Sequence, residues 1–310
     1  MKLVAILLSF LLIGNYGIVE MSLKDDAFHS DLPFHIETWY FEALFDSNES
    51  MVFMITVMKC RQHGIMMTGV HLYNNGKIIY EGRKIFTSFF ISDEIPFIST
   101  ENETLMEGYI MKNHLCYNIS YNSSFSFSLK FINTTMGWKA TDEKWIAVPN
   151  MVVDGFISFN GNGSKVRGKG YHDHNIFFLF SPFIRRGYMD GRVMMENVSI
   201  VWAKLMSNIF LQQNFVIVST SSFQLIENAD IECRDYEINH GRPIPTTFLI
   251  RASEGNVSLN ITLHASTIHF IRLPLLHYWR YHVHAIGEIK IDGERKGIDT
   301  YDMMEYMLFT

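Results

Sequence analysis

The densest group of reactive side chains in the sequence lies in one short segment, which reads Gly168-Lys169-Gly170-Tyr171-His172-Asp173-His174-Asn175. This segment sits within a strand-like run, and side chains alternate between the two faces of a β-strand. Tyr171, Asp173 and Asn175 are therefore expected on one face, and His172 and His174 on the other. The two glycines leave room for the close approach of a ligand or of a neighbouring strand.

Asp173 is the residue of this segment best suited to catalysis. A carboxyl group that faces an apolar barrel interior is poorly hydrated when it ionises, so burial raises its pKa and keeps a proton available near neutral pH. Such a group is a candidate general acid. The alternative interpretation is that Asp173 only forms hydrogen bonds between strands or in a turn.

Two His-x-His pairs, His172 with His174 and His282 with His284, raise the question of a metal site. Four histidines can close a tetrahedral site. However, no carboxylate lies two residues away on the histidine face to serve as a further ligand. We therefore favour the interpretation that each pair forms the polar outer face of a half-exposed strand, and we assign no metal and no cofactor.

A second segment of unusual content, His35 to Phe41, also reads as a strand and places Glu37, Trp39 and Phe41 on one face. The two aromatic rings are typical of a core, but a carboxylate buried among them needs a charged or hydrogen-bonding partner, or a functional role. Trp145, Trp202, Tyr278 and Trp279 are interpreted as barrel lining or core. The predicted ligand-binding residues are Glu37, Trp39, Trp145, Asn175, Tyr278 and Trp279.

The elements that must position these residues are β-strands. From residue 34 onward, short apolar or alternating runs are broken every 8 to 12 residues by Gly, Asn or Asp. No stretch carries a sustained helical stripe with caps at both ends. Turns are expected at 74–76, 160–163, 190–191 and 292–293, where Asn, Asp and Gly supply the positive φ of tight hairpins. The predicted strands are 51–58, 66–73, 77–86, 105–112, 115–121, 125–131, 151–159, 169–177, 194–205, 215–219, 223–227, 246–251, 258–268, 279–291 and 303–309.

The number of predicted strands exceeds one simple barrel. Two consecutive lipocalin-like antiparallel β-barrels fit the 310 residues, since closing a sheet removes its exposed edges. We place the first barrel at residues 22–180 and the second at 181–310, with the boundary in the stretch 178–192. A long β-sandwich is the alternative architecture.

Composition excludes several functional classes. Hydrophobic residues make up 48% of the chain and charged residues 19%, which excludes a disordered chain. The net charge is -6 with both signs interspersed, so nucleic acid is not an expected partner. No serine-hydrolase elbow, phosphate-binding loop or dinucleotide fingerprint is present. Cys60, Cys116 and Cys233 permit at most one disulfide and are expected to be buried apolar residues.

Two features bear on the compartment. Residues 3–13 form an apolar run of signal-peptide length after Lys2, so we expect residues 1–21 to be a signal peptide or anchor of an exported or envelope protein. If Met21 is the true start, the protein is cytoplasmic. Nine N-x-[ST] triplets exceed chance and favour an extracytoplasmic, glycosylated surface, although Asn-rich turns produce the same triplets. They begin at Asn48, Asn102, Asn118, Asn122, Asn133, Asn162, Asn197, Asn256 and Asn260.

These motifs resemble those of the carotenoid 1,2-hydratase (hydroxyneurosporene synthase) and AttH-like family. Its members open with a Glu-Trp-Trp-Tyr-Phe strand, similar to Glu37–Phe41 here, and carry a Gly-x-Gly-Tyr-x-Asp-x-Asn-Trp-Gly segment, similar to Gly168–Asn175. A strand containing Tyr278-Trp279-Arg280 resembles the second barrel of the family. The resemblance covers residues 22–310 and implies a double lipocalin-like fold.

In function, the resemblance implies cofactor-free chemistry on an apolar isoprenoid or lipid, as a hydro-lyase, isomerase or cyclase. Carried over, Asp173 would protonate an alkene, Tyr171 would assist it, and aromatic faces such as Trp39 or Trp145 would stabilise the cation before water adds. Thr38, Ile176-Phe177 and Met189 depart from the family pattern, so the ligand is expected to differ. A non-catalytic lipid carrier of the cell envelope, with peripheral membrane association left open, is the alternative, and a glycan-displaying surface protein is a third.

Overall fold

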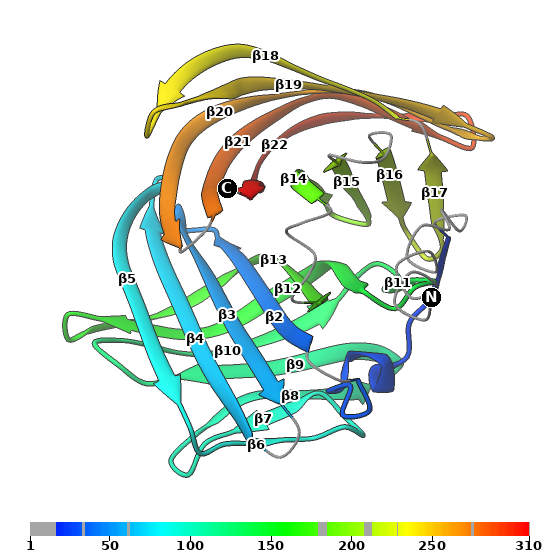
Figure 1. The fold of residues 1–310 in the computed structure, drawn as a ribbon. Coiled ribbons are helices and arrows are strands. Elements are labelled where there is room, and N and C mark those ends of the chain that lie inside the picture. The colour runs from blue at the N-terminus through cyan, green and yellow to red at the C-terminus, as the bar shows by residue number, and fades with distance from the viewer. Residues whose placement is uncertain are drawn as a thin grey trace, which may run out of the picture.

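The protein is all-β, as the sequence predicts, with two curled antiparallel sheets that face each other (Figure 1). The computed structural model describes residues 17–32, 35–60, 63–178, 185–207, 213–227, 229–273 and 276–309. The predicted signal-peptide run at 3–13 lies outside these residues. Within the described residues, no helical segment has the length and apolar character that crossing a bilayer requires.

The first sheet has 13 strands in the order β5-β4-β3-β2-β13-β12-β10-β9-β8-β7-β6, with β1 and β11 paired beside β12. A 3-10 turn, η1 (Leu23–Asp26), precedes β2. The strands are β1 (Ile18–Glu20), β2 (His35–Phe45), β3 (Glu49–Cys60), β4 (His63–Asn74), β5 (Lys77–Phe86), β6 (Phe90–Ile91), β7 (Phe97–Ser99), β8 (Thr104–Met111), β9 (His114–Tyr121), β10 (Phe125–Asn133), β11 (Trp138–Ala140), β12 (Trp145–Phe159) and β13 (Asn162–Phe178).

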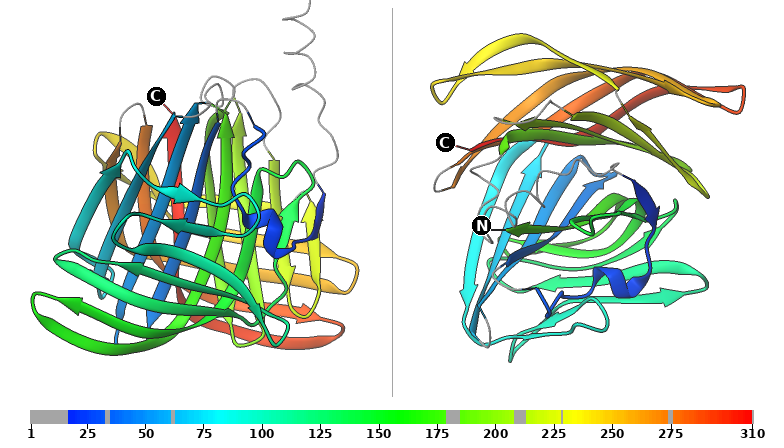
Figure 2. Two further views of the ribbon diagram at one scale, coloured as in Figure 1. Left: turned by 90° about the horizontal axis from the view of Figure 1, so that it is seen from below. Right: turned by 45° about the vertical axis from the view of Figure 1, so that its right-hand side comes forward.

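The second sheet has nine strands in the order β17-β16-β15-β14-β22-β21-β20-β19-β18. The right-hand view of Figure 2 shows it curving over the first sheet. The strands are β14 (Arg185–Met195), β15 (Val198–Ser207), β16 (Gln213–Ser219), β17 (Phe223–Glu227), β18 (Asp230–Asn239), β19 (Arg242–Glu254), β20 (Val257–Leu273), β21 (Leu276–Ile291) and β22 (Glu294–Phe309).

Each sheet encloses its own apolar core on its concave side. In the first sheet, alternate residues of β2 such as Trp39, Phe41 and Phe45 enter this core. In the second sheet, Trp202, Phe248 and Trp279 do the same. A strand with one face in such a core is stabilised by roughly 1.5 to 3 kcal/mol for each large apolar side chain that it buries.

A third apolar cluster joins the two sheets. Tyr40 of β2 and Tyr171 of β13 project from the face opposite to the first core, and they pack with Met194, Ala203 and Phe215 of the second sheet. The central strands β2 and β13 are therefore buried on both faces. This explains why most of β2 is buried although its sequence mixes polar and apolar residues.

Most predicted turns are confirmed, but one is wrong. The expected turns at 74–76, 160–163 and 292–293 connect β4 to β5, β12 to β13 and β21 to β22, with positive φ at Asn75, Asn160 and Asp292. In contrast, Asp190-Gly191 lies within β14 and pairs with both β15 and β22. Asp-Gly is a common turn pair, but here the tertiary pairing of the strand outweighs its local preference.

Several strands differ from the sequence-based ranges. The short strands β1, β6, β7 and β11 and most of β14 were not predicted. β18 was not predicted either, because its sequence carries five charged residues and alternates only weakly. The predicted strand at 194–205 is in fact the end of β14 and most of β15, separated by a turn at Glu196 and Asn197. Most of the stretch 178–192, which we expected to be a boundary, is either part of β14 or outside the described residues.

The glycines of β13 accommodate a neighbouring strand. A Cβ atom on Gly168 would lie 2.0 Å from the carbonyl oxygen of Leu44 in β2. One on Gly170 would lie 2.5 Å from the Val153 side chain and 2.8 Å from the carbonyl oxygen of Glu42. Both glycines thus permit close packing of β13, and they fix the position of the residues that follow.

Candidate active site

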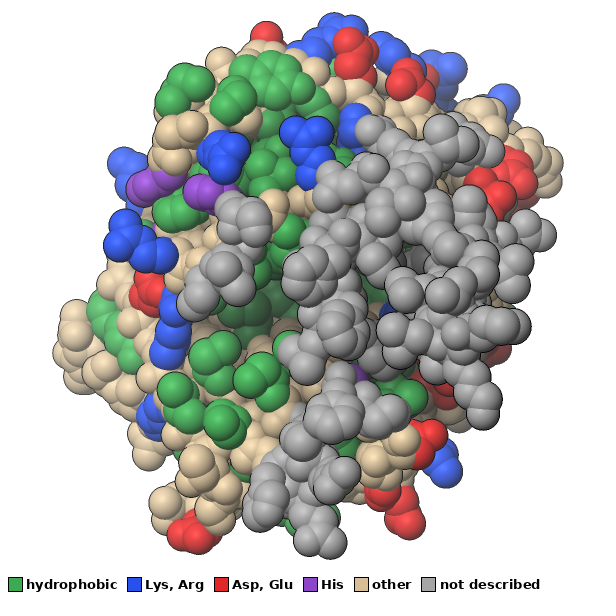
Figure 3. All heavy atoms as spheres, in the orientation of Figure 1, with side chains coloured by type: hydrophobic (Ala, Val, Ile, Leu, Met, Phe, Trp, Pro, Cys, Tyr) green, Lys and Arg blue, Asp and Glu red, His purple; other side chains and the backbone are tan. Residues whose placement is uncertain are grey.

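The candidate site is a mainly apolar cavity of about 250 Å³ between the two sheets. Its walls come from β2, β3, β4, β5, β12 and β13 of the first sheet and from β14, β15, β20, β21 and β22 of the second. On the face of the molecule drawn in Figure 3, hydrophobic side chains gather between the two sheets. We expected Asp173 to face the interior of a barrel, but it faces this space between the sheets instead.

Asp173 forms part of the cavity wall and is held by its neighbours on β13. The Tyr171 hydroxyl donates to Oδ2 at 2.9 Å, and the Asn175 amide donates to Oδ1 at 2.8 Å. The residue is 5% exposed. Burial raises the pKa of the Asp173 carboxyl to about 6, against the opposing influence of the Arg192 guanidinium. The three residues share one face, as the alternation predicts.

Two further carboxyl groups face the cavity from the second sheet. Asp190 of β14 and Glu305 of β22 are direct partners in the strand register. Burial, followed by the nearby charge of Glu305, raises the pKa of Asp190 well above its usual range. Its Oδ1 atom is buried without a hydrogen-bond partner. Sequence reasoning missed both residues, since Asp190 was interpreted as part of a turn.

Two buried arginines lie next to these acids, Arg192 beside Asp190 and Arg280 beside Glu305. Arg192 pairs with Glu42, donates to the Tyr40 hydroxyl at 2.9 Å and lies 4.4 Å from the centre of the Tyr171 ring. Its guanidinium therefore connects the two sheets. Burial lowers the pKa of Arg192, but the charge and hydrogen bond of Glu42 together with the nearby Tyr40 and Tyr171 raise it further, so it lies well above its usual range.

Arg280 of β21 makes the second connection. Its guanidinium lies 3.0 Å from Glu305, donates to the Tyr278 hydroxyl at 2.7 Å and reaches His71 and Tyr73 of the first sheet at 2.7 and 3.0 Å. Arg280 and Arg192 together bring two positive charges to a cluster of four carboxyl groups, namely those of Glu42, Asp173, Asp190 and Glu305. Complete ionisation would leave two uncompensated negative charges in a buried region, so protons are favoured on Asp173 and Asp190.

The other residues that were predicted to bind a ligand lie on both sides of the sheets. Trp145, Asn175 and Tyr278 line the cavity together with Asp173. Glu37, Trp39 and Trp279 do not, because their side chains project from the opposite faces of their strands into the two cores. Their assignment to ligand binding does not fit this cavity.

The first His-x-His pair differs from expectation, whereas in the second pair His284 is half-exposed as expected. His172 and His174 are fully buried rather than half-exposed, and they face Asp26 of η1 and Glu37 of β2. The sequence could not indicate this, since Asp26 is distant from both histidines along the chain. His282 and His284 contact other groups, namely Ser50 and Asp299. The four histidines therefore do not form one tetrahedral site.

No protein-family model and no curated protein matches the sequence. Solved structures do match the fold. Kievitone hydratase from Nectria haematococca has a TM-score of 0.62 at 10% identity, over 96% of this chain and 95% of its own. A structure described as AttH from Nitrosomonas europaea has a TM-score of 0.60 at 12% identity, over 93% and 96%. CghA with Sch210972 has a TM-score of 0.60 at 8% identity, over 96% and 99%.

These neighbours cover nearly the whole chain, so the agreement extends to both sheets. At such low identity they establish the fold and leave the chemistry to the site. The chain therefore has the double-lipocalin fold of AttH-like proteins, as the resemblance in its motifs predicts.

Proposed function

We propose that the cavity binds an apolar, unsaturated isoprenoid or lipid and that Asp173 is the general acid of a cofactor-free hydration or isomerisation. The observation that carries this proposal is a carboxyl group with a raised pKa in the wall of a mainly apolar cavity. A neighbour of the same fold is named as a hydratase, which is consistent with this chemistry.

The proposed reaction begins when Asp173 transfers its proton to one carbon of a double bond. The resulting carbocation would be stabilised by the π-face of Trp145, which lines the cavity. In hydration, water then adds to the cationic carbon and loses a proton, which returns to Asp173. In isomerisation, the cation instead loses a proton from an adjacent carbon to the same carboxylate.

The size of the cavity limits the ligand. Pockets that hold drug-sized molecules measure roughly 300 to 1,000 Å³, and this one is slightly smaller at about 250 Å³. It therefore suits a short isoprenoid, or the reactive end of a longer chain. Lys144, Arg83 and Asp142 also line the cavity and offer contacts to a polar group of the ligand.

The test is turnover in D₂O with short acyclic isoprenoids, such as geraniol and farnesol, and with the lipid that co-purifies with the protein. We expect wild-type protein to incorporate deuterium at the protonated carbon. Asp173→Asn should slow this by at least about 100-fold, in the range that general acids contribute, while ligand binding remains. Asp154→Asn, an exposed carboxylate of β12, is the matched control and should react like wild type.

A non-catalytic carrier is the second candidate function. Both oxygens of Asp173 already accept hydrogen bonds from its neighbours on β13, an arrangement that also serves a purely structural role. In that case lipid would co-purify with the protein, no deuterium would enter it, and Asp173→Asn would leave both results unchanged. That outcome would overturn the catalytic proposal and retain the cavity.

A further inference from the structure

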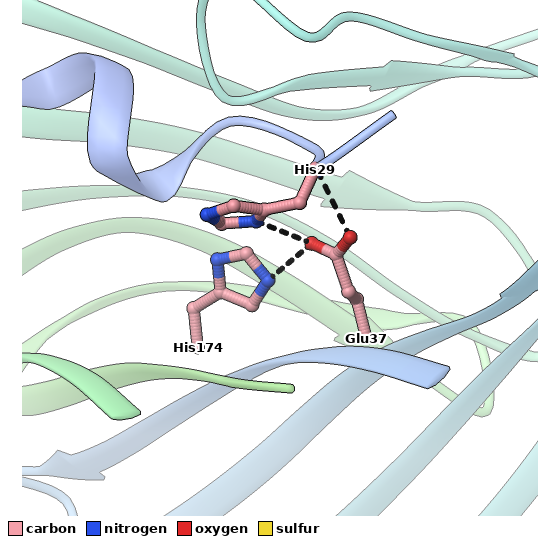
Figure 4. Close-up of side chains that lie close together, drawn as sticks. All are labelled: His29, Glu37 and His174. Atoms are coloured by element: carbon pink, nitrogen blue, oxygen red, sulfur yellow. Dashed lines mark hydrogen bonds and ion pairs between the residues drawn. The ribbon is translucent and has the colours of Figure 1, made fainter. Parts of the chain in front are cut away.

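A second cluster of polar groups is buried on the other face of β13, inside the first sheet. His29, from the loop after η1, Glu37 of β2 and His174 of β13 point toward one another (Figure 4). The His29 Nδ1 atom lies 3.2 Å and the His174 Nε2 atom 2.7 Å from the same Glu37 oxygen, Oε2. Three ligand-type atoms from three separate segments therefore converge on one point.

The spacing of these atoms suits a first-row divalent cation. Zinc binds nitrogen and oxygen at about 2.0 to 2.2 Å, so two ligands of a tetrahedral ion lie about 3.3 Å apart. The His29–Glu37 separation of 3.2 Å already meets this distance. The His174–Glu37 separation of 2.7 Å would need to widen by about half an ångström. Two imidazoles and one carboxylate also form a common ligand set for such ions.

The surroundings of the cluster orient these ligands. The other Glu37 oxygen, Oε1, lies 2.6 Å from His35 Nε2, which fixes the carboxylate. The other nitrogen of His174, Nδ1, faces Asp26 Oδ1 at 3.2 Å, and its ring stacks on Trp39. A histidine with one nitrogen toward an ion and the other toward a carboxylate is the arrangement that metal sites use to fix the imidazole.

The balance of charge also favours a cation at this point. The carboxyl groups of Asp26 and Glu37 are both fully buried and lie against histidines, which carry a charge only when protonated. Two carboxylates carry two negative charges, and one divalent ion bound by neutral imidazoles would balance them.

We propose that His29 Nδ1, Glu37 Oε2 and His174 Nε2 bind one divalent transition-metal ion, with zinc as the representative, and that Asp26 and His35 orient its ligands. His29 is the exposed member, with 20% of its side chain accessible, so it marks the solvent side of the site and a fourth coordination position for water. The ion lies across the sheet from Asp173. It would tie the segment that contains η1 to β2 and β13.

The alternative is a cluster held by protons alone, in which the histidines donate hydrogen bonds to the two carboxylates. Isothermal titration of chelator-treated protein with ZnCl₂ separates the two cases. We expect about one zinc ion per chain and a higher melting temperature with zinc. Cobalt substitution should give the visible absorption of a four- or five-coordinate ion with nitrogen and oxygen ligands.

His29→Ala is the informative variant, because the residue lies in a loop and its loss should leave the fold intact. It should weaken zinc binding by at least about 100-fold, with unchanged circular dichroism. His264→Ala removes an exposed histidine of β20 and should bind zinc like wild type. Absence of zinc binding at millimolar concentration, or equal binding by wild type and His29→Ala, would overturn the proposal. Since the ion does not touch the cavity, neither result depends on the activity of Asp173.

Discussion

At the scale of single residues, the environment of Asp173 decides its chemistry. Its carboxyl group is buried beside Arg192, whose positive charge favours ionisation, yet the cost of desolvation is larger. The nearby carboxylate of Glu305 acts in the same direction as burial. The group therefore retains its proton at a pH where an exposed aspartate has already lost it, and this is the property that a general acid needs.

The raised pKa of Asp173 predicts how stability depends on pH. The folded protein holds this proton up to about pH 6, while the unfolded chain releases it near 3.8, so the contribution of Asp173 to stability falls as pH rises between these values. By pH 7 the loss amounts to about 3 kcal/mol. Asp173→Asn cannot ionise, so it does not lose this contribution. The difference in free energy of unfolding between Asp173→Asn and wild type should therefore rise in favour of the variant by about 3 kcal/mol between pH 3.5 and 7.

Urea unfolding at a series of pH values measures this difference. Asp154→Asn should show no comparable trend, because Asp154 is exposed. Parallel curves for wild type and Asp173→Asn would mean that Asp173 has an ordinary pKa, and would remove the main support for its role as an acid.

The sequence predicts part of this site and misses the rest for a physical reason. Tyr171, Asp173 and Asn175 lie on one strand, so the two-residue period is sufficient to place them together. Asp190 and Glu305 meet them only because the second sheet folds over the first. No local pattern encodes that contact, and the Asp190-Gly191 pair has the composition of a turn.

At the scale of elements, β13 is the strand that organises the molecule. One of its faces carries Asp173 toward the cavity, and the other carries His172 and His174 toward Asp26 and Glu37. A shift of its register by one residue would exchange the two sets. Sequence reasoning predicted the alternation but assigned the histidines to a half-exposed face, because it could not show that both faces of β13 are covered.

Gly168 sets the distance between β13 and β2, and its replacement should be costly. An alanine Cβ would lie 2.0 Å from the Leu44 carbonyl oxygen and 2.8 Å from the Phe45 Cα atom, and backbone atoms within a sheet cannot move aside independently. We expect Gly168→Ala to lower the free energy of unfolding by about 3 kcal/mol, the upper part of the usual range for overpacking.

Gly297→Ala provides the matched control for this prediction. Gly297 lies in β22, and an added Cβ would meet no atom within 4 Å. Its substitution should be neutral or stabilise the protein by up to about 1 kcal/mol. Chemical denaturation of both variants measures the contrast. Equal effects would show that the strands separate easily at Gly168.

At the scale of the whole molecule, the cavity belongs to neither sheet alone. Asp173 and Trp145 come from the first sheet, and Asp190, Tyr278 and Glu305 come from the second. Arg192 and Arg280 hold the sheets together through Glu42, His71 and Tyr73 of the first sheet. The same buried charges thus create the acid cluster and fix the relative position of the two halves that enclose it.

The pair of Arg192 and Glu42 is the critical connection, since both side chains are almost completely buried. Removing one partner leaves an uncompensated buried charge, which typically costs about 3 to 5 kcal/mol. We therefore expect Arg192→Met to destabilise the protein by this amount and to split its calorimetric unfolding into two transitions, one for each sheet. Arg167→Met removes an exposed arginine of β13, 3.9 Å from Asp154, and should change stability by less than about 1 kcal/mol.

The double variant Arg192→Met with Glu42→Gln tests the physical cause. If the cost of Arg192→Met arises from the charge left on Glu42, neutralising that residue should recover at least about 1 kcal/mol relative to the sum of the two single variants. Strictly additive effects would instead indicate that Arg192 acts through its packing on Tyr171, from which its guanidinium lies 4.4 Å. In that case the cation–π contact with Tyr171, rather than the ion pair with Glu42, would be what holds the two sheets around the cavity.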